Sequence, residues 1–335
     1  MALHENRFSG ASVLVTGGLG FIGSALARRL VALDAQVLLV DSLIPEYGGN
    51  LFNIDDIRDR VTVNISDVRD ATAMARLVER QDFLFNLAGQ TSHIDSMTDP
   101  VTDLNINAAA QLYILEACRQ HNPMIKIVFA STRQVYGRPQ YLPVDEDHPL
   151  NPVDVNGVNK LAGEWYHLLY NRIYGIRASC LRLTNTYGPA MRVKDARQTF
   201  LGIWIRRLIE GKSIQVFGTG EQRRDFNFVD DAVEALLLAA ADPASEGQVF
   251  NLGSDEHISL VELAALLVKL AGEGSYEMVP FPADRAAIDI GDYYGRFDKI
   301  RTGLGWMPNV RLQEGLSRTL AYYRKSHAHY WDASS

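Results

Sequence analysis

The 335-residue sequence has few cysteines, no long apolar run and no excess of positive charge. Its two cysteines, Cys118 and Cys180, lie in apolar segments far apart, a pattern that suits neither a disulfide framework nor a metal site. No run of about 18 apolar residues predicts a membrane span, and the first ten residues lack the apolar centre of a signal peptide. We therefore expect a cytoplasmic protein with buried thiols, no metal and no membrane partner.

A net charge of −7 also argues against the basic surface that binding to a nucleic-acid backbone requires. Internal repeats and low-complexity tracts are absent from the sequence. What the chain does have is a hydrophobic content of 47%, enough for the core of one large or two modest domains. We expect a folded globular protein that binds no nucleic acid.

A glycine-rich turn near the start of the chain carries the strongest local signal. An apolar run over residues 13–15 leads into the glycines of residues 17–23, and a helical pattern follows. The spacing matches G-x-G-x-x-G, in which glycine lets the backbone approach a pyrophosphate. Asp41 ends the next apolar run, about 20 residues further on, where an acid can bind the adenosine ribose. No arginine adjoins Asp41 to take a 2′-phosphate, so NAD is favoured over NADP.

The rest of the chain predicts an α/β fold, a doubly wound parallel sheet (Rossmann) with a smaller α/β substrate-binding cap domain. Apolar runs over 61–63, 83–87 and 125–129 alternate with helical stretches, and the alternation becomes irregular beyond Arg182. Ligands of such sheets bind at the carboxyl ends of the strands. The predicted NAD-binding domain covers residues 1–183 plus about 228–258, and the predicted substrate-binding domain covers 184–227 plus about 259–330.

A series of short motifs, in a fixed order, carries a resemblance to a known family. They are Thr16–Gly23, Asp67-Val68, Leu87-Ala88-Gly89-Gln90, Asn107, Ser131-Thr132, Val135-Tyr136-Gly137, Lys160, Arg182, Asn185–Pro189, Arg224-Asp225-Phe226, Asn251–Ser254 and Leu304-Gly305-Trp306. From residue 13 to about residue 323 the chain resembles the extended short-chain dehydrogenase/reductases, specifically the NAD-dependent nucleotide-sugar epimerase/dehydratase family. The resemblance implies an enzyme that moves a hydride from a sugar carbon onto NAD and usually returns it. It also implies a homodimer formed through helices near 100–121 and 156–174.

The same resemblance implies the contacts of the cofactor and of a nucleotide-sugar substrate. The cofactor residues would be Gly17, Gly20, Phe21, Ile22, Gly23, Asp41, Asp67, Val68, Leu87, Ala88, Gly89 and Lys160. Asn185 and Arg224 would grip the nucleotide diphosphate, since a guanidinium offers paired hydrogen bonds to phosphate oxygens. A further arginine that many members carry is replaced here by Asp289, and Arg285 and Arg296 are candidates to compensate.

Position 156 departs from the family pattern. Members carry a tyrosine four residues before the lysine as the acid–base group, whereas this chain has Asn156, whose neutral carboxamide cannot take a proton near pH 7. Thr132 is expected beside the reacting alcohol, and Asn156 is expected to orient a water or the sugar hydroxyl. The candidates for the proton transfer are His93, Tyr141, Lys160 and Tyr136, although Tyr136 is expected to pack instead. A histidine suits this role because its unperturbed pKa is about 6.5.

A second departure narrows the predicted reaction. The 4,6-dehydratases have an Asp-Glu pair after the threonine, and this chain has Arg133-Gln134, which supplies no carboxylate. We therefore predict an NAD-dependent epimerase that acts on a nucleotide-diphosphate sugar through a transient keto sugar. The alternatives are a nucleotide-sugar decarboxylase or dehydratase, and a non-catalytic NAD-binding sensor or partner protein.

Overall fold

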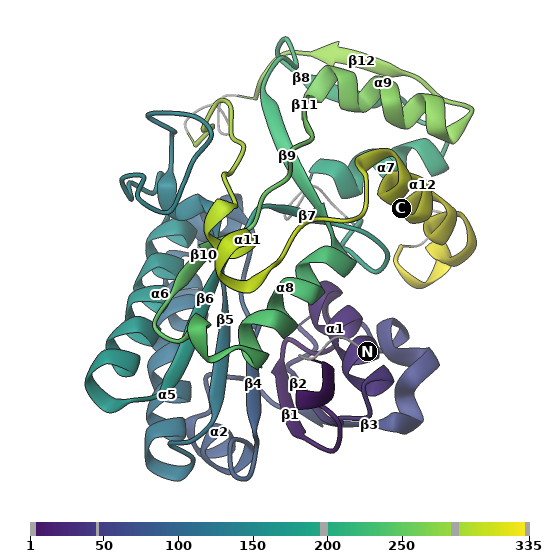
Figure 1. Ribbon diagram of the computed structural model, residues 1–335. Helices are drawn as coiled ribbons and strands as arrows, with labels where there is room; N and C mark the ends of the chain where they lie inside the picture. The colour runs from purple at the N-terminus through teal and green to yellow at the C-terminus, as the bar shows by residue number, and fades with distance from the viewer. Residues whose placement is uncertain (1–4, 45–46, 195–199, 283–287, 332–335) are drawn as a thin grey trace.

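The computed structural model describes residues 5–44, 47–194, 200–282 and 288–331 (Figure 1). The strands are β1 (Ser12–Thr16), β2 (Gln36–Asp41), β3 (Val61–Ile65), β4 (Phe83–Asn86), β5 (Lys126–Thr132), β6 (Arg177–Leu183), β7 (Asn185–Tyr187), β8 (Ile214–Phe217), β9 (Arg223–Phe228), β10 (Val249–Asn251), β11 (His257–Ser259) and β12 (Tyr276–Val279). The α-helices are α1 (Phe21–Ala32), α2 (Ala71–Leu77), α3 (His93–Thr98), α4 (Pro100–Leu104), α5 (Ala110–His121), α6 (Val155–Tyr174), α7 (Phe200–Ile209), α8 (Val229–Ala241), α9 (Leu260–Ala271), α11 (Asp298–Leu304) and α12 (Leu312–Ser326). Shorter helical segments lie at Glu5–Arg7, Leu51–Arg60, Asn105–Ala109, Arg133–Tyr136, Pro243–Ser245 and His327–His329.

A parallel sheet forms the centre of the molecule. In the described part of the chain it has seven strands, in the order β10-β6-β5-β4-β1-β2-β3. Helices α1 and α8 cover one face, and α2, α5 and α6 cover the other (Figure 1). Strand residues such as Val13–Val15 and Ile127–Phe129 are completely buried, as expected where helices cover both faces. The predicted doubly wound parallel sheet is confirmed.

The tight turn between β1 and α1 depends on its glycines. Gly17 has a φ of +68°, a region that glycine enters without a steric penalty. A Cβ on Gly23 would lie 2.1 Å from the carbonyl oxygen of Gly17, so a side chain there would force the helix away from the turn. The sequence motif thus allows α1 to begin directly against the end of β1.

The chain leaves the large sheet after β6 and returns to it with α8 and β10. The intervening and later residues build two small sheets, β11-β9-β7 and β12-β8, together with α7, α9 and α12 (Figure 1). This arrangement supports the discontinuous division into two parts, which we keep as a proposal. His257 and Ile258 pair with β9 of the small sheet, close to the proposed boundary at about residue 258.

One detail of the fold differs from the predictions. The helix predicted over about 100–121 contains a π-helical turn at Asn105–Ala109. Among the described residues, no helix has both the length and the apolar character needed to cross a bilayer.

His329 and Tyr330, near the end of the described chain, pack beside the glycine turn. The His329 ring stacks on Phe52 with centroids 3.6 Å apart, and the Tyr330 hydroxyl donates to Asn53 Oδ1 at 2.7 Å. Asn53 Nδ2 in turn donates to the carbonyl oxygen of Leu19, within the glycine turn, at 2.8 Å. Residues 329–330 are therefore connected to the turn through the 3-10 helix Leu51–Arg60.

Candidate active site

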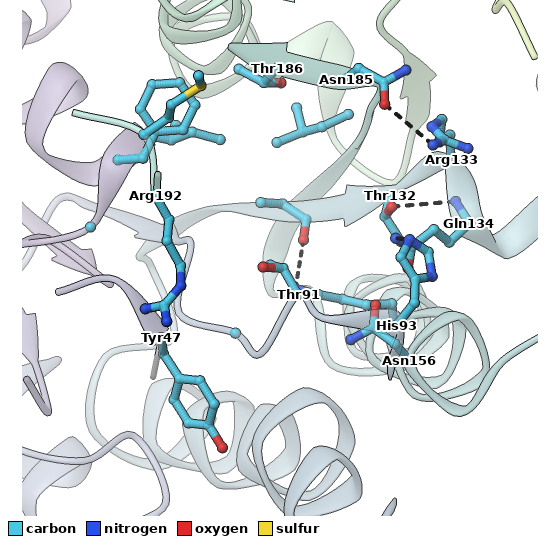
Figure 2. A pocket seen from close by; sticks show the side chains of 18 of the residues that line it. Tyr47, Thr91, His93, Thr132, Arg133, Gln134, Asn156, Asn185, Thr186 and Arg192 are labelled. Atoms are coloured by element: carbon cyan, nitrogen blue, oxygen red, sulfur yellow. Dashed lines mark hydrogen bonds between the residues drawn. The ribbon is translucent and has the colours of Figure 1, made fainter. Parts of the chain in front are cut away.

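A cavity of about 670 Å³ lies at the carboxyl ends of the parallel strands, between the large sheet and the small sheets (Figure 2). Most of the site residues expected from the sequence line it. They are Gly17, Gly20, Phe21, Ile22, Gly23, Asp41, Asp67, Val68, Leu87, Ala88, Gly89, His93, Thr132, Asn156, Lys160, Asn185 and Arg224. Arg285 lies outside the described residues, and Arg296 pairs with Asp298 at 3.7 Å on the surface.

The N-terminus of α1 faces this cavity. Its first turn, Phe21 to Gly23, carries no acidic residue, and its N-cap Gly20 supplies no side-chain hydrogen bond. The first backbone N–H groups of a helix lack intrahelical acceptors and carry partial positive charge. This end of the cavity is therefore suited to an anion such as a pyrophosphate.

Two carboxylates lie near the ends of β2 and β3: Asp41 is the last residue of β2, and Asp67 comes two residues after β3. Asp41 accepts hydrogen bonds from the backbone N–H groups of Leu43 at 2.9 Å and Leu19 at 3.1 Å. Burial raises the pKa of Asp41, and these two hydrogen bonds partly oppose that rise. The pKa of Asp67 is lowered, chiefly by its hydrogen bonds from Arg69. Both carboxylates line the cavity on the side of the glycine turn.

Lys160 and Asn107 bring polar atoms together around Gly89. Lys160 is only 5% exposed, and its Nζ donates to the carbonyl oxygen of Ala130 at 3.1 Å. A Cβ on Gly89 would lie 2.9 Å from both Lys160 Nζ and Asn107 Oδ1. Within the described chain, Asn107 Oδ1 is buried without a hydrogen-bond partner. Together with the glycine turn and Asp41, these groups fit a dinucleotide.

Asn156 is held by a buried carboxylate rather than directed freely into the cavity. Its Nδ2 donates to the carbonyl oxygen of Gln90 at 2.7 Å and to Asp103 Oδ2 at 2.9 Å. Asp103 is fully buried and also accepts from Nδ2 of Asn107 at 3.0 Å and of Asn159 at 2.7 Å. Both N–H groups of Asn156 thus have acceptors inside the protein, and the side chain is a fixed part of the cavity wall.

His93 and Asp154 form a pair on the same side of the cavity. His93 Nδ1 is hydrogen-bonded to Asp154 Oδ2, and Nε2 contacts the Gln134 carboxamide (Figure 2). Asp154 also caps α6 by accepting from the Gly157 N–H at 2.7 Å. Burial acts to raise the pKa of Asp154, but His93, the Gly157 N–H and Arg133 together bring it below the usual value. An ionised Asp154 keeps a proton on Nδ1, which leaves Nε2 of a neutral His93 as the basic nitrogen.

Thr132 lies next to this pair, whereas two of the predicted acid–base candidates lie elsewhere. Thr132 Oγ1 accepts from the backbone N–H of Gln134 at 3.3 Å, beside His93 (Figure 2). The Tyr136 hydroxyl is buried between Arg182 and Asn251, and burial raises its pKa. The Tyr141 hydroxyl donates to Asp145 at 2.7 Å, which raises its pKa to about 12. Tyr136 therefore packs as expected, and the hypothesis that Tyr141 acts as the base is wrong because of its position.

Two arginines, Arg133 and Arg224, lie close enough together in the cavity wall for their charges to interact. Arg224 is 6% exposed, and Nη1 donates to the carbonyl oxygen of Arg223 at 2.9 Å. Burial, reinforced by the charge of Arg133, lowers the pKa of Arg224 to about 10. Asn185, the first residue of β7, links β9 to Arg133. Its Nδ2 donates to the carbonyl oxygen of Asp225 at 2.9 Å, and its Oδ1 accepts from Arg133 Nη2 at 3.3 Å.

The sequence reasoning missed Asp154 and treated Arg133 only as a departure from the family. An acid before an amphipathic helix is a recognisable N-cap signal, so the place of Asp154 at the start of α6 could have been predicted. Its contact with His93 could not, because the two residues are 61 positions apart in the chain.

Fold and cavity together define a dinucleotide-binding protein of the doubly wound α/β class, with its ligand site at the carboxyl ends of the strands. The family model described as "NAD dependent epimerase/dehydratase family" matches residues 13–253, and the chain belongs to this family. The predicted family and the predicted cofactor, NAD, are thereby confirmed.

Individual relatives differ in their reactions. The chain is 32% identical over 315 residues to a UDP-glucose 4-epimerase of Mycolicibacterium smegmatis, covering 93% of this chain and 98% of the relative. It is 30% identical over 329 residues to a dTDP-glucose 4,6-dehydratase of Streptomyces niveus, covering 96% and 94%. Its structure is similar to that of the Thermotoga maritima UDP-glucose 4-epimerase with UDP-glucose, with a TM-score of 0.84, 30% identity and coverage of 94% and 99%. The relatives are thus nucleotide-sugar enzymes of more than one reaction class.

Proposed function

We propose that this protein is an NAD-dependent epimerase of a nucleotide-diphosphate sugar in which His93, paired with Asp154, replaces the missing tyrosine as the acid–base group. The observation that carries the proposal is the hydrogen bond between Asp154 and His93 Nδ1, in a cavity wall shared with Thr132. A carboxylate that fixes the tautomer of a histidine is a common way to prepare the second ring nitrogen for proton transfer.

The residues of the cavity divide the work as follows. NAD, when bound, supplies reversible hydride acceptance from a sugar carbon. His93 Nε2 takes the proton of the sugar hydroxyl and later returns it, and the Thr132 hydroxyl orients that same alcohol. Gln134 occupies Nε2 in this structure, so the sugar hydroxyl has to take the place of its carboxamide. Lys160 holds the nicotinamide ribose, while Arg224 and Asn185 hold the diphosphate.

An epimerase is preferred to a dehydratase because Arg133 and Gln134 follow Thr132. Neither side chain can act as the carboxylic acid or the carboxylate of an elimination. An epimerisation requires one proton to be removed from the alcohol and later returned to it. The basic nitrogen of His93 can do both.

The direct test identifies first the bound molecules and then the product. Purified protein is denatured, and the released small molecules are identified by mass spectrometry; NAD is expected. The protein is then incubated with UDP-, dTDP-, CDP- and GDP-linked sugars. An epimerase gives a product of unchanged mass with inverted stereochemistry at one carbon. Loss of water or of carbon dioxide would instead identify a dehydratase or a decarboxylase, and NAD release without turnover of any sugar would favour a non-catalytic sensor.

We also propose that the protein forms a homodimer through the outer face of α4 and α6. Val158, Trp165, Leu169 and Ile173 are 41–59% exposed, and their spacing places them on one side of α6. Val101 on the adjacent α4 extends this surface and is 63% exposed. A contiguous apolar surface of this kind is typical of a protein–protein interface.

A further inference from the structure

Arg133 is a charged group in the cavity for which the proposed chemistry has no use. It directly follows Thr132 at the end of β5 and begins the 3-10 turn Arg133–Tyr136. Its side chain lines the cavity, beside Thr132 and Gln134 on one side and Asn185 on the other (Figure 2). The guanidinium therefore lies between the group that orients the reacting alcohol and a residue assigned to the diphosphate.

The hydrogen-bonding capacity of Arg133 is only partly used. Nη2 donates to Asn185 Oδ1 at 3.3 Å, and the guanidinium carbon lies 5.0 Å from the centre of the Tyr293 ring. Nη1 is buried and, among the residues that the structure describes, has no hydrogen-bond partner. An unsatisfied N–H of a buried cation is costly, which makes such an atom a candidate to bind a ligand.

The charge of Arg133 is also poorly compensated by the protein. Arg224 has Asp289 at 3.7 Å, whereas within the described part of the chain no carboxylate oxygen lies within ion-pair distance of Arg133. Desolvation lowers the pKa of Arg133, against the weaker opposing influence of Tyr293, Asp225, Asp154 and Asp289. Arg133 and Arg224 thus lie in the same part of the cavity, and Arg133, which adjoins Thr132, has less compensation from carboxylates than Arg224.

From this geometry we infer that the sugar of the substrate carries a carboxylate, as in a hexuronic acid, and that Arg133 binds it. A guanidinium offers two parallel N–H groups that match the two oxygens of a carboxylate. The proposed function assigns Arg224 and Asn185 to the diphosphate, and Arg133 would supply a second anion site beside the reacting alcohol. The inference rests on the proposed function, because it assumes that a nucleotide sugar occupies the cavity.

Binding of matched ligands to the NAD-loaded protein tests the inference by calorimetry. The probes are UDP-glucose with UDP-glucuronate, dTDP-glucose with dTDP-glucuronate, and UDP and dTDP alone. Of UDP-glucuronate and dTDP-glucuronate, the one that binds more tightly is expected to bind the wild type about tenfold more tightly than the glucose compound with the same nucleotide. One charge-assisted hydrogen bond accounts for a difference of this size. In Arg133→Gln this ratio should fall to about one, while Arg133→Lys, which keeps the charge, should retain part of it. Arg224→Gln should weaken the binding of the glucose and the glucuronate compound of each pair by the same factor.

Each other outcome overturns the inference in a recognisable way. Equal binding of glucose and glucuronate by the wild type would exclude a carboxylate site but leave the proposed function intact. An Arg133→Gln variant that binds UDP and dTDP as weakly as it binds the glucuronates would assign Arg133 to the diphosphate. If the wild type bound none of the nucleotide sugars, the proposed function itself would fail. Circular dichroism of each variant checks that it is folded.

Discussion

His93 and Asp154 are the residues on which the proposed proton transfer depends. Replacement of His93 by Gln should lower kcat about 10²- to 10⁴-fold, because general acid–base catalysis contributes that much. Asp154→Asn should lower kcat less, since asparagine still caps α6 but no longer favours the Nδ1–H tautomer. Steady-state kinetics on the substrate identified above is the measurement. The assignment fails if His93→Gln retains wild-type kcat in a folded, NAD-loaded protein.

Asn156 and Asn159 make the same type of hydrogen bond to Asp103, which provides a matched pair of variants. Either substitution by Ala should lower the free energy of unfolding by about 1–3 kcal/mol, because the buried carboxylate loses an amide donor. Urea denaturation measures this loss. A kcat that falls further in Asn156→Ala than in Asn159→Ala indicates that Asn156 also orients substrate. Equal kcat values would limit Asn156 to a structural role.

Lys160 predicts a pH dependence of NAD binding. Desolvation, the main cause, lowers the pKa of its ammonium from 10.5 to about 8. The charged form is therefore present below about pH 8 and lost above it, so the Kd for NAD should rise several-fold between about pH 7 and pH 9. Titration of NAD-free protein, followed by tryptophan fluorescence, measures this. Lys160→Met should bind NAD weakly at every pH. A wild-type Kd that stays constant over this range would contradict the assigned role.

The sequence predicts those site residues whose chemistry is contained in a short motif. The glycine turn and Asp41 belong to one strand–helix–strand unit, so their positions follow from local spacing. Asp103 of α4 accepts hydrogen bonds from Asn107 in the π-helical turn and from Asn156 and Asn159 in α6. No local sequence pattern predicts these contacts between separate elements. Arg133 is visible in the sequence as a departure, but its unsatisfied Nη1 is a property of the folded cavity.

At the scale of elements, α6 both supplies Lys160 to the cavity and presents Trp165 to the surface. Trp165 is 57% exposed, and Trp165→Glu would place a charge in the proposed dimer interface. We expect this variant to have the mass of a monomer and the wild type that of a dimer, since burying an unpaired charge opposes association. Light scattering coupled to size-exclusion chromatography gives both masses. Tyr276→Glu, at an exposed aromatic on β12, is the control and should leave the dimer intact.

Periodicity identifies these elements better than it identifies their irregularities. The long α6 ends at Gly175, which adopts the left-handed conformation typical of a helix C-terminus, and its limits agree with the prediction within a residue or two. The π-helical turn at Asn105–Ala109 keeps the chain helical, so hydrophobic spacing alone does not reveal it. That turn contains Asn107, whose side chain reaches both Asp103 and the neighbourhood of Gly89.

At the scale of the whole molecule, His329 and Tyr330 contact residues that bond to the glycine turn near the start of the chain, and we expect them to stabilise it. The double variant His329→Ala and Tyr330→Ala removes the stack on Phe52 and the hydrogen bond to Asn53. It should lower the free energy of unfolding by about 1–3 kcal/mol and weaken NAD binding several-fold. Thermal unfolding and calorimetry measure the two effects. Lys325→Ala, at an exposed position of α12, should change neither, and unchanged NAD affinity in the double variant would refute the connection.

The pairing of β10 with β6 also determines when the large sheet can be completed during synthesis. β6 is made by residue 183, but its outer partner is made only after the whole segment 184–248. In the interval, the buried apolar residues and backbone groups of β6 form an open sheet edge, the kind of surface on which strands of other chains add. A nascent or prematurely terminated chain that ends before Val249 is thus expected to aggregate. Once residues 249–251 have left the ribosome, β10 covers that edge of β6 from within the same polypeptide and becomes the short outer strand of the sheet.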